Sequence, residues 1–435
     1  MFEKKVYAVA GRPILHSRSP FLFNSFFGEL GLNATYTRLL AKNAEQAVMM
    51  VNAVGLDGAN ITSPFKKGVI TFLDALKGPA MKVDAVNCVV REKGGLVGYN
   101  TDVTGAVQAL RKNGIRLSGR KVVILGAGGA ARAVAAGCMK AQAESVTLVN
   151  RSRERAKEAA EHLDCEYGDP EKLKGLIVQS DILISCLPSV SRLIEPSVLR
   201  KKLVVMDANY RDSWLLSRAS EKGCRIISGL DWLFYQALPC FELFTHKKIS
   251  RHLENKIRCM LTTAPRTEKS SIALIGFMGS GKTHVGRGLA EKTAVPFIDT
   301  DDVIEEQVGS SISEIFREKG EGFFRQVEKS VIRRILSDSG KRVISFGGGC
   351  VLDPENRDLI RKQCLSIWLW VTLETAMKRM DLCSRPLLNV PQAKEKAFSM
   401  LEQRKFLYAQ TADLVIDAET GDINNLVQRI VDEMG

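Results

Sequence analysis

Short apolar runs separated by amphipathic stretches recur along the chain, and each run ends at a glycine or a polar residue. Val, Ile and Leu fill the consecutive positions of these runs, which is typical of strands buried on both faces of a parallel sheet. Alternation of such strands with helical stretches predicts an α/β fold with its chemistry at the carboxyl ends of the strands. The clearest runs are 121–128, 145–152, 181–189, 203–210, 272–277, 296–302, 342–349 and 365–371.

The alternation is interrupted once, by the polar segment 263–270, which contains one proline. A chain of 435 residues exceeds what one hydrophobic core usually holds, so we interpret this segment as a linker between two α/β halves. In the first half we expect a substrate domain over 1–105, completed by about 235–262, and a Rossmann domain over 106–234. In the second half we expect a P-loop domain with a parallel sheet over 271–435.

Charge and composition narrow the class of partner. The net charge of +13 comes from the first 265 residues, which hold 38 Lys and Arg against 24 Asp and Glu, whereas residues 271–435 hold 22 against 24. Because no block of consecutive basic residues occurs, we expect anionic small molecules and no nucleic acid as partners. The short apolar N-terminal stretch and the absence of any apolar run of eighteen residues favour a cytoplasmic enzyme with no membrane association. The ten cysteines form no CxxC pair, so we expect free thiols rather than a zinc site.

A first glycine-rich turn, "GAGGAA", follows the run at 121–125 and precedes a helical stretch. Gly126, Gly128 and Ala131 fit the dinucleotide pattern, in which glycines allow a tight turn and close approach of the backbone to a pyrophosphate. A plain strand–helix turn fits the same string. The expected cofactor-binding set in this turn also includes Gly129 and Ala130.

The end of the next predicted strand favours NADP over NAD. An acidic residue there would hold ribose hydroxyls, but "LVNRSRERA" has Asn150, Arg151 and Ser152, with Arg155 one turn later. Two guanidinium groups suit a 2′-phosphate, which a carboxylate would repel. A solvated basic turn is the alternative interpretation.

Five polar strings outside this turn resemble shikimate dehydrogenase, over residues from about 5 to 255. They are "GRPILHSRSP", "GANITSPFKK", "AVNCV", "GYNTDVTG" and "GLDWLFYQALPCF". The resemblance implies that Lys66 and Asp102 are the catalytic pair, and that Gly229 belongs to the cofactor site. It implies a substrate-binding set of Ser17, Ser19, Asn60, Thr62, Asn87, Tyr210 and Gln236.

This implied chemistry is physically consistent. A small polyhydroxylated carboxylate needs short hydroxyl and amide partners. Hydride transfer to its ketone leaves an oxyanion that an ammonium group beside a carboxylate can stabilise and protonate. Four positions depart from the family pattern, so we expect an atypical nicotinamide end of the site: Phe23, Cys88, Cys186 and Asp212.

A second glycine-rich turn, "GFMGSGKT", matches the phosphate-binding loop GxxxxGK[ST] after a strand and before a helix. In such loops backbone N–H groups surround the phosphates, the lysine reaches the β- and γ-phosphates, and the hydroxyl binds magnesium. We therefore expect an ATP site with Mg²⁺. Its residues are Gly276, Gly279, Ser280, Gly281, Lys282 and Thr283.

The strings after this loop resemble shikimate kinase, in order and over the whole of 271–435. They are "PFIDTDDVIEE", "ISEIFREKGEGFFRQVE", "SFGGGCV", "SRPLL" and "EQRKFLYAQTADLVID". The resemblance implies that Asp301 orients or deprotonates the attacking hydroxyl, and that Asp299 supports magnesium. It implies substrate binding by Arg325, Arg404 and the glycines Gly347, Gly348 and Gly349, and a phosphoryl contact from Arg385.

Both resemblances concern one metabolite, so the sequence predicts a bifunctional enzyme of aromatic amino-acid biosynthesis. It would reduce 3-dehydroshikimate with NADPH and phosphorylate the resulting shikimate with ATP, and we expect tethering by the linker without channelling. The alternatives are a shikimate kinase with a quinate- or shikimate-sensing or quinate-oxidising first half, a regulator that has lost its chemistry, and a different small-molecule kinase.

Overall fold

The computed structural model describes residues 4–188, 193–211, 213–263, 269, 271–380, 387–388, 390–419 and 422–434. Helices and strands alternate along the chain, which confirms the predicted α/β class. The chain divides into two compact units: the first comprises residues 1–20, 30–57 and 265–435, and the second comprises 21–29 and 58–264. Asp212, Arg385 and most of the predicted linker lie outside the described residues.

A six-stranded parallel sheet in the order β12-β11-β10-β7-β8-β9 forms one part of the second unit. This is the strand order of a doubly wound Rossmann sheet, in which the order of the strands reverses between β7 and β10 and ligands bind at that switch point. The strands are β7 (Lys121–Leu125), β8 (Ser145–Val149), β9 (Glu166–Gly168), β10 (Ile182–Ser185), β11 (Val204–Asp207) and β12 (Arg225–Ile227).

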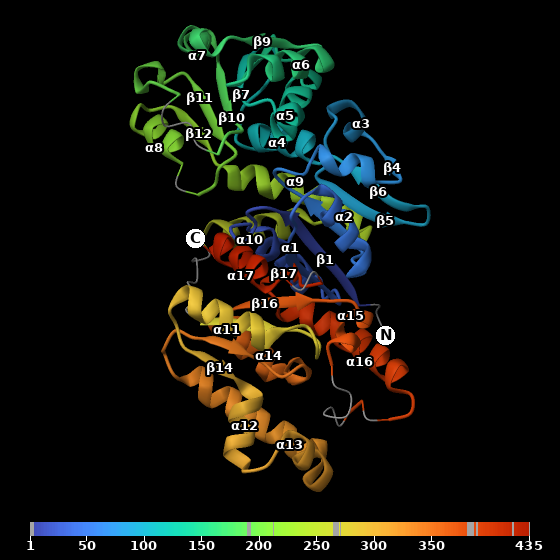
Figure 1. Cartoon of the computed structure of the whole chain (residues 1–435). Coiled ribbons are helices and arrows are strands. Elements are labelled where there is room, and N and C mark those ends of the chain that lie inside the picture. Colours follow the sequence, from blue (N-terminus) through green and yellow to red (C-terminus); the bar gives the residue numbers. More distant parts are fainter. Residues whose placement is uncertain are drawn as a thin grey trace. The chain divides into compact units, whose positions relative to one another are not determined.

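Helices cover both faces of this sheet (Figure 1). On one face, apolar side chains of β7, β10 and β11 form a core with α7 and α8. Helices on the other side of the sheet are α5 and α6, which follow β7 and β8 along the chain. The helices are α5 (Gly129–Lys140), α6 (Arg153–Leu163), α7 (Leu173–Gln179) and α8 (Trp214–Glu221).

The rest of the second unit contains four strands in the order β3-β5-β6-β4 and the long helices α4 and α9. Phe23, a departure from the family pattern, is fully buried and contacts Phe26, Phe27 and Phe244, so it is a core residue of this packing. The elements are α1 (Ser19–Glu29), whose first two residues belong to the first unit, β3 (Gly58–Ile61), β4 (Ala75–Leu76), α3 (Pro79–Val83), β5 (Cys88–Glu92), β6 (Gly95–Tyr99), α4 (Asp102–Lys112), α9 (Gly229–Thr245) and α10 (Arg251–Thr263).

The first unit contains parallel strands in the order β14-β15-β13-β16-β17-β2-β1. Two strands from the start of the chain therefore extend the sheet formed by the P-loop half. The strands are β1 (Lys5–Gly11), β2 (Ala34–Leu40), β13 (Ser271–Ile275), β14 (Phe297–Asp299), β15 (Val343–Ser345), β16 (Cys364–Trp370) and β17 (Leu414–Asp417).

Eight α-helices accompany the described strands of the first unit. The longest, α13, contains a kink at Gly320, whose φ of 80° lies in the left-handed region that favours glycine. Among the described residues, no helix combines the length and apolar character needed to cross a membrane. The helices are α2 (Ala44–Ala53), α11 (Lys282–Thr293), α12 (Thr300–Val308), α13 (Ile312–Ser337), α14 (Pro354–Gln363), α15 (Leu373–Lys378), α16 (Ala393–Thr411) and α17 (Ile423–Met434).

Two candidate active sites

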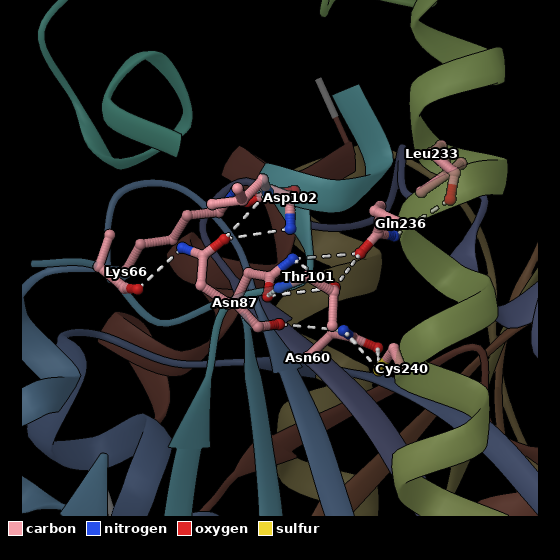
Figure 2. A network of polar contacts seen from close by, with 11 residues as sticks. Asn60, Lys66, Asn87, Thr101, Asp102, Leu233, Gln236 and Cys240 are labelled. Carbon is pink, nitrogen blue, oxygen red and sulfur yellow. Dashed lines mark hydrogen bonds and ion pairs between the residues drawn. The ribbon is translucent and has the colours of Figure 1, made fainter. Parts of the chain in front are cut away.

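Lys66 and Asp102 form a close ion pair in the second unit (Figure 2). Lys66 Nζ lies 2.7 Å from Asp102 Oδ2, and the two side chains are 16% and 7% exposed. Asn100 holds the start of α4, because its Oδ1 accepts from the Asp102 amide at 3.1 Å while its Nδ2 donates to the Ala85 carbonyl at 2.8 Å. The ammonium group is thus aimed by a carboxylate at a fixed helix start, which suits proton donation to an oxyanion.

A cluster of side-chain amides lies beside this pair (Figure 2). Asn87 Nδ2 donates to Thr101 Oγ1 at 3.0 Å and to Gln236 Oε1 at 3.2 Å, and Asn87 Oδ1 accepts from the Thr101 amide at 2.7 Å. Asn60 Nδ2 donates to the Asn87 carbonyl at 3.0 Å. The fold therefore brings together three of the predicted substrate-binding residues, Asn60, Asn87 and Gln236. It adds Thr101 to them, a residue that was not predicted from the sequence although it directly precedes Asp102.

Two buried thiols complete the cluster. Cys240, one turn after Gln236 on α9, accepts from Asn60 Nδ2 at 3.2 Å, and its Sγ lies 3.1 Å from that of Cys88. Burial raises the pKa of the Cys88 thiol well above its usual range, so this thiol is neutral at physiological pH. The departure at Cys88 therefore places a neutral group beside the amides. Cys240 follows Gln236 by four residues, so both lie on the same face of α9, and this spacing could have predicted that Cys240 belongs to the site.

The first glycine-rich turn has the backbone that its pattern predicts. Gly126 has a φ of 119°, and Gly128 precedes the first residue of α5. A Cβ on Gly129 would lie 3.1 Å from Lys66 Cβ, so the turn passes close to the ion pair. Gly126 also lies opposite Cys186, which follows β10, at the point where the order of the strands in the sheet reverses. A ligand on this turn would thus reach the Lys66 side of the site. Ala130 and Ala131 belong to the first turn of α5.

The predicted phosphate-binding residues lie at the start of α6. Ser152 caps this helix by accepting from the Arg155 amide at 3.3 Å, and Asn150 Nδ2 donates to the Ser152 carbonyl at 3.0 Å. Arg151 and Arg155 are exposed. The local geometry therefore leaves two guanidinium groups accessible at a helix N-terminus, an arrangement that attracts an anion.

The other residues of the first predicted site are more scattered. A Cβ on Gly229 would lie 2.4 Å from the Ala208 carbonyl oxygen, so glycine permits the close approach of α9 to the turn after β11, where Tyr210 also lies. Thr62 is half-buried after β3, and its carbonyl accepts from the Phe65 amide. Ser17 and Ser19 are buried in the first unit, where Ser17 Oγ accepts from the Ser19 amide at 3.3 Å.

The phosphate-binding loop of the first unit joins β13 to α11. Gly276, Gly279 and Gly281 all have φ between 76° and 146°, which other residues rarely adopt. Lys282 Nζ donates to the carbonyls of Gly276 and Phe277, at 3.1 Å each. Ser280 Oγ is buried and has no hydrogen-bond partner in the part of the chain that the structure describes. This loop is therefore shaped around a ligand that offers acceptor oxygens.

Carboxylates from the start of α12 face this loop. Thr283 Oγ1 donates to Asp299 Oδ2 at 2.8 Å, and Asp299 Oδ1 accepts from the Asp301 amide at 3.1 Å. A hydroxyl and a carboxylate side by side next to a phosphate-binding loop are oxygen ligands of the kind that Mg²⁺ prefers, so the donor set fits the predicted metal.

A cavity next to Asp301 collects the predicted substrate-binding residues of this half. Arg325 pairs with Glu328 at 2.8 Å and with Glu321 at 3.0 Å, and the buried Arg404 donates to the Gly348 carbonyl at 3.3 Å. Burial raises the pKa of Glu328 to about 7, against the opposing charge of Arg325. The cavity is lined by Met278, Asp301, Ile312, Phe316, Phe324, Arg325, Glu328, Gly347, Gly348, Gly349, Leu387 and Arg404.

Two glycines at the wall of this cavity lie very close to the Arg325 and Asp301 side chains. A Cβ on Gly349 would lie 2.3–2.5 Å from the Arg325 guanidinium, and one on Gly347 would lie 2.9 Å from Asp301 Oδ1. Asp301, both arginines and the three glycines therefore surround one space. Arg379, six positions before Arg385, donates to the carbonyls of Ala418 and Glu419 at 3.0 and 2.7 Å, outside the residues that line this cavity.

Three family models match the chain. Residues 9–89 match the shikimate dehydrogenase substrate binding domain, residues 108–209 match shikimate / quinate 5-dehydrogenase, and residues 278–435 match shikimate kinase. The matches follow the order in which the two resemblances were found along the sequence.

Individual relatives cover the first half of the chain. The shikimate dehydrogenases (NADP⁺) of Pyrococcus abyssi and Pyrococcus furiosus are 35% and 38% identical to it over 247 and 250 residues, covering 55% and 56% of this chain and 92% and 91% of theirs. The crystal structure of shikimate 5-dehydrogenase from Thermus thermophilus, in complex with NADP(H) and shikimate, is 28% identical with a TM-score of 0.53. It covers 59% of this chain and 99% of its own.

Proposed function

The chain belongs to the shikimate dehydrogenase family and ends in a shikimate kinase domain, and from this premise we propose that it makes and then phosphorylates shikimate. The observation that supports the proposal most directly is the presence of two separate sets of reactive groups in one chain. One set is the Lys66–Asp102 pair with its amide cluster, and the other is the P-loop with the arginine-lined cavity beside Asp301.

For the reduction of 3-dehydroshikimate, NADPH supplies the hydride. Lys66 donates a proton to the ketone oxygen as the carbonyl carbon gains the hydride, and it regains a proton from solvent afterwards. Asp102 aims the ammonium group and stabilises it at 2.7 Å. Asn60, Asn87 and Gln236 bind ring hydroxyls. We assign further substrate contacts to Ser17, Ser19, Thr62 and Tyr210.

The glycine-rich turn and the start of α6 are our proposed NADP-binding elements. Gly128 and Gly129 lie at the N-terminus of α5, where unpaired amides suit a pyrophosphate. The exposed guanidiniums of Arg151 and Arg155 suit a 2′-phosphate, which supports NADP over NAD.

For the second reaction, ATP supplies the phosphoryl group and Mg²⁺ offsets the charge of its phosphates. Lys282 and the loop amides bind the phosphates, and Thr283 and Asp299 are our proposed metal-binding residues. Asp301 accepts the proton of the attacking hydroxyl, and Arg325 and Arg404 bind the substrate carboxylate. Gly347, Gly348 and Gly349 allow the ring to lie against the backbone.

A coupled assay tests the proposal. Purified protein is given 3-dehydroshikimate, NADPH, ATP and magnesium, and shikimate and shikimate 3-phosphate are both quantified over time. We expect shikimate 3-phosphate only when both NADPH and ATP are present, and accumulation of shikimate when ATP is omitted. Phosphorylation of added shikimate without oxidation of NADPH would instead indicate a first half that only binds its ligand. Preferential oxidation of quinate with NADP⁺ would assign the first half to quinate.

A further inference from the structure

We propose that the last strand and helix of the kinase domain hold the loop that carries Ser17, so that the dehydrogenase's affinity for shikimate depends on the kinase domain. This inference rests on the proposed role of Ser17 in substrate binding. It concerns contacts within the first unit, made by residues 14–17 and 37–46 with residues 412–417 and 429–433.

The two segments share a sheet. Val415 and Ile416 of β17 pair in parallel with Leu39 and Leu40 of β2. Side chains strengthen the junction on both sides of this ladder, since Thr37 Oγ1 donates to the Ala412 carbonyl at 2.8 Å and Gln46 Nε2 donates to Asp417 Oδ2 at 2.7 Å. Two paired residues alone make a weak edge contact, but the buried side-chain bonds define its register.

Arg38 connects this junction to the Ser17 loop. Its Nη2 and Nε donate to the Ser17 carbonyl at 2.7 and 3.2 Å, and its Nη1 donates to the Asp413 carbonyl at 3.2 Å. Asp413 is itself held, because its carboxylate accepts from Lys269 at 2.6 Å and from Ser366 Oγ at 2.9 Å. The guanidinium therefore joins the loop to a rigid point of the kinase domain.

Glu433 holds the other end of the loop from α17. Its buried carboxylate accepts from the backbone amides of Ile14 and Leu15, the latter at 3.2 Å. Arg429, on the same helix and also buried, donates to the Leu40 carbonyl at 3.4 Å. A buried carboxylate that accepts two successive amides is a strong anchor, because its removal would leave both donors unsatisfied.

Residues 14–17 are thus held at one end directly by Glu433 of α17, and at the other end by Arg38 of β2, which itself donates to the Asp413 carbonyl. Within this segment the Ser17 amide donates to the Ile14 carbonyl at 2.9 Å, which makes it a tight turn. Since the turn is rigid between the two anchors, loss of either anchor will displace the Ser17 hydroxyl. Arg38 and Glu433 are accordingly positioning residues for the first reaction, and neither lies in the proposed kinase site.

The interface is tested first by cutting the chain. A protease recognition sequence is inserted within 264–268, the full chain is cleaved, and the fragments are run on a size-exclusion column. We expect the two fragments to co-elute, and to separate when the chain carries Arg38→Met and Glu433→Ala. The matched control is Asp432→Asn, which changes a neighbouring carboxylate that is 48% exposed and lies 3.7 Å from Arg12. Separation of the unsubstituted fragments, or co-elution of the doubly substituted ones, would overturn the interface.

The functional part is tested with uncut protein. We expect Glu433→Ala and Arg38→Met each to raise the KM for shikimate in NADP⁺ reduction by about tenfold. Glu433→Ala removes the acceptor of the Ile14 and Leu15 amides, and Arg38→Met removes the donor to the Ser17 carbonyl. The KM for NADP⁺ and the kinase turnover should stay within about twofold of the wild type, as for surface substitutions. A merely structural role would lower both activities together, whereas the proposal requires the split.

Two results separate this inference from the proposed function. If wild-type protein oxidises no shikimate at all, the dehydrogenase assignment fails, and the cleavage experiment still decides whether the interface exists. If the enzyme is active but Glu433→Ala matches Asp432→Asn in its KM for shikimate, the kinase domain is joined to the loop without affecting it, and the inference is wrong.

Discussion

The two candidate sites differ in how far their own residues satisfy their buried polar groups. In the dehydrogenase site, Lys66 pairs with Asp102, and Asn87 hydrogen-bonds Thr101 and Gln236. In the kinase site, Ser280 Oγ, Glu328 Oε1 and Arg404 Nε are buried without any hydrogen-bond partner among the described residues. An unsatisfied buried polar atom lowers the stability of the folded state by about 1–3 kcal/mol. A polar ligand that bonds these atoms would regain that stability.

The dehydrogenase site and the kinase site therefore depend to different extents on their ligands for hydrogen bonds. The dehydrogenase site is preorganised by its own hydrogen bonds, so a substitution there affects the direction of a reactive group. The kinase site depends on partners that phosphates and a carboxylate would bring, so a substitution there affects the interaction with the ligand. Substitutions in each site can therefore distinguish the two cases.

Lys66→Ala removes the group that we assign to proton donation. We expect kcat for 3-dehydroshikimate reduction to fall about 10²- to 10⁴-fold with little change in KM, as for loss of a general acid. Steady-state kinetics measure both parameters. Lys67→Ala is the matched control, since the neighbouring lysine is exposed and pairs with Asp84 and Glu158 instead. A raised KM with unchanged kcat would make Lys66 a binding residue.

Asp301→Asn removes the proposed base of the kinase site and keeps its shape. We expect kinase kcat to fall about 10²-fold, because the amide cannot accept the hydroxyl proton, while 3-dehydroshikimate reduction is unchanged. Asp302→Asn serves as the control on the same helix turn. Equal kinase rates for the two variants would show that Asp301 has no special role.

Glu328 makes the stability of the kinase part depend on pH. Its folded-state pKa of about 7 exceeds the usual carboxyl value, so between these values the folded state keeps a proton that the unfolded state has released. Raising the pH from about 5 to 8 should therefore lower the unfolding free energy by on the order of 2 kcal/mol.

Thermal unfolding of wild type and Glu328→Gln across this range measures the effect. The variant should lose most of the pH dependence, because it has no titrating carboxyl at this position. Glu321→Gln, which alters the more exposed acidic partner of Arg325, should keep the wild-type slope. The same slope in Glu328→Gln as in wild type would contradict the assignment.

Gly349→Ala tests the close approach at the cavity wall. The added methyl group would lie within 2.5 Å of the Arg325 guanidinium and force it to move. Because overpacking costs about 1–3 kcal/mol, we expect the kinase KM for shikimate to rise about tenfold. Gly322→Ala is the control, since a Cβ there would meet nothing within 4 Å. A KM equal to that of the control would show that Arg325 adapts without loss.

Local patterns predicted much of both sites. Both glycine-rich turns lie directly after buried strands, as predicted. Their backbone has φ values of 119° at Gly126 and 88° at Gly281, which favour glycine, and a run of glycines is visible in the sequence. The resemblances identified Lys66 and Asp102, 36 positions apart, and the structure places them in hydrogen-bond contact. The matched families confirm the predicted pair of enzymes.

Contacts between distant segments were not predictable in this way. Thr101 and Gln236 meet across 135 positions, and a Cβ on Gly105 would lie 2.4 Å from Gln236 Cβ, so close packing of α4 on α9 brings the amides together. The periodicity of apolar residues in a helix indicates which face is buried, but it does not indicate which other element packs against that face.

The α/β class, the two glycine-rich turns and the pair of activities could be predicted from the chain alone, since these depend on local backbone requirements and short motifs. The fold was needed to show which groups contact one another: the thiol beside Asn60, the acid beside Arg325, and the strand that pairs with β17. Those choices follow from packing and hydrogen bonding between segments up to 419 positions apart, as between Ile14 and Glu433, and no local pattern records them.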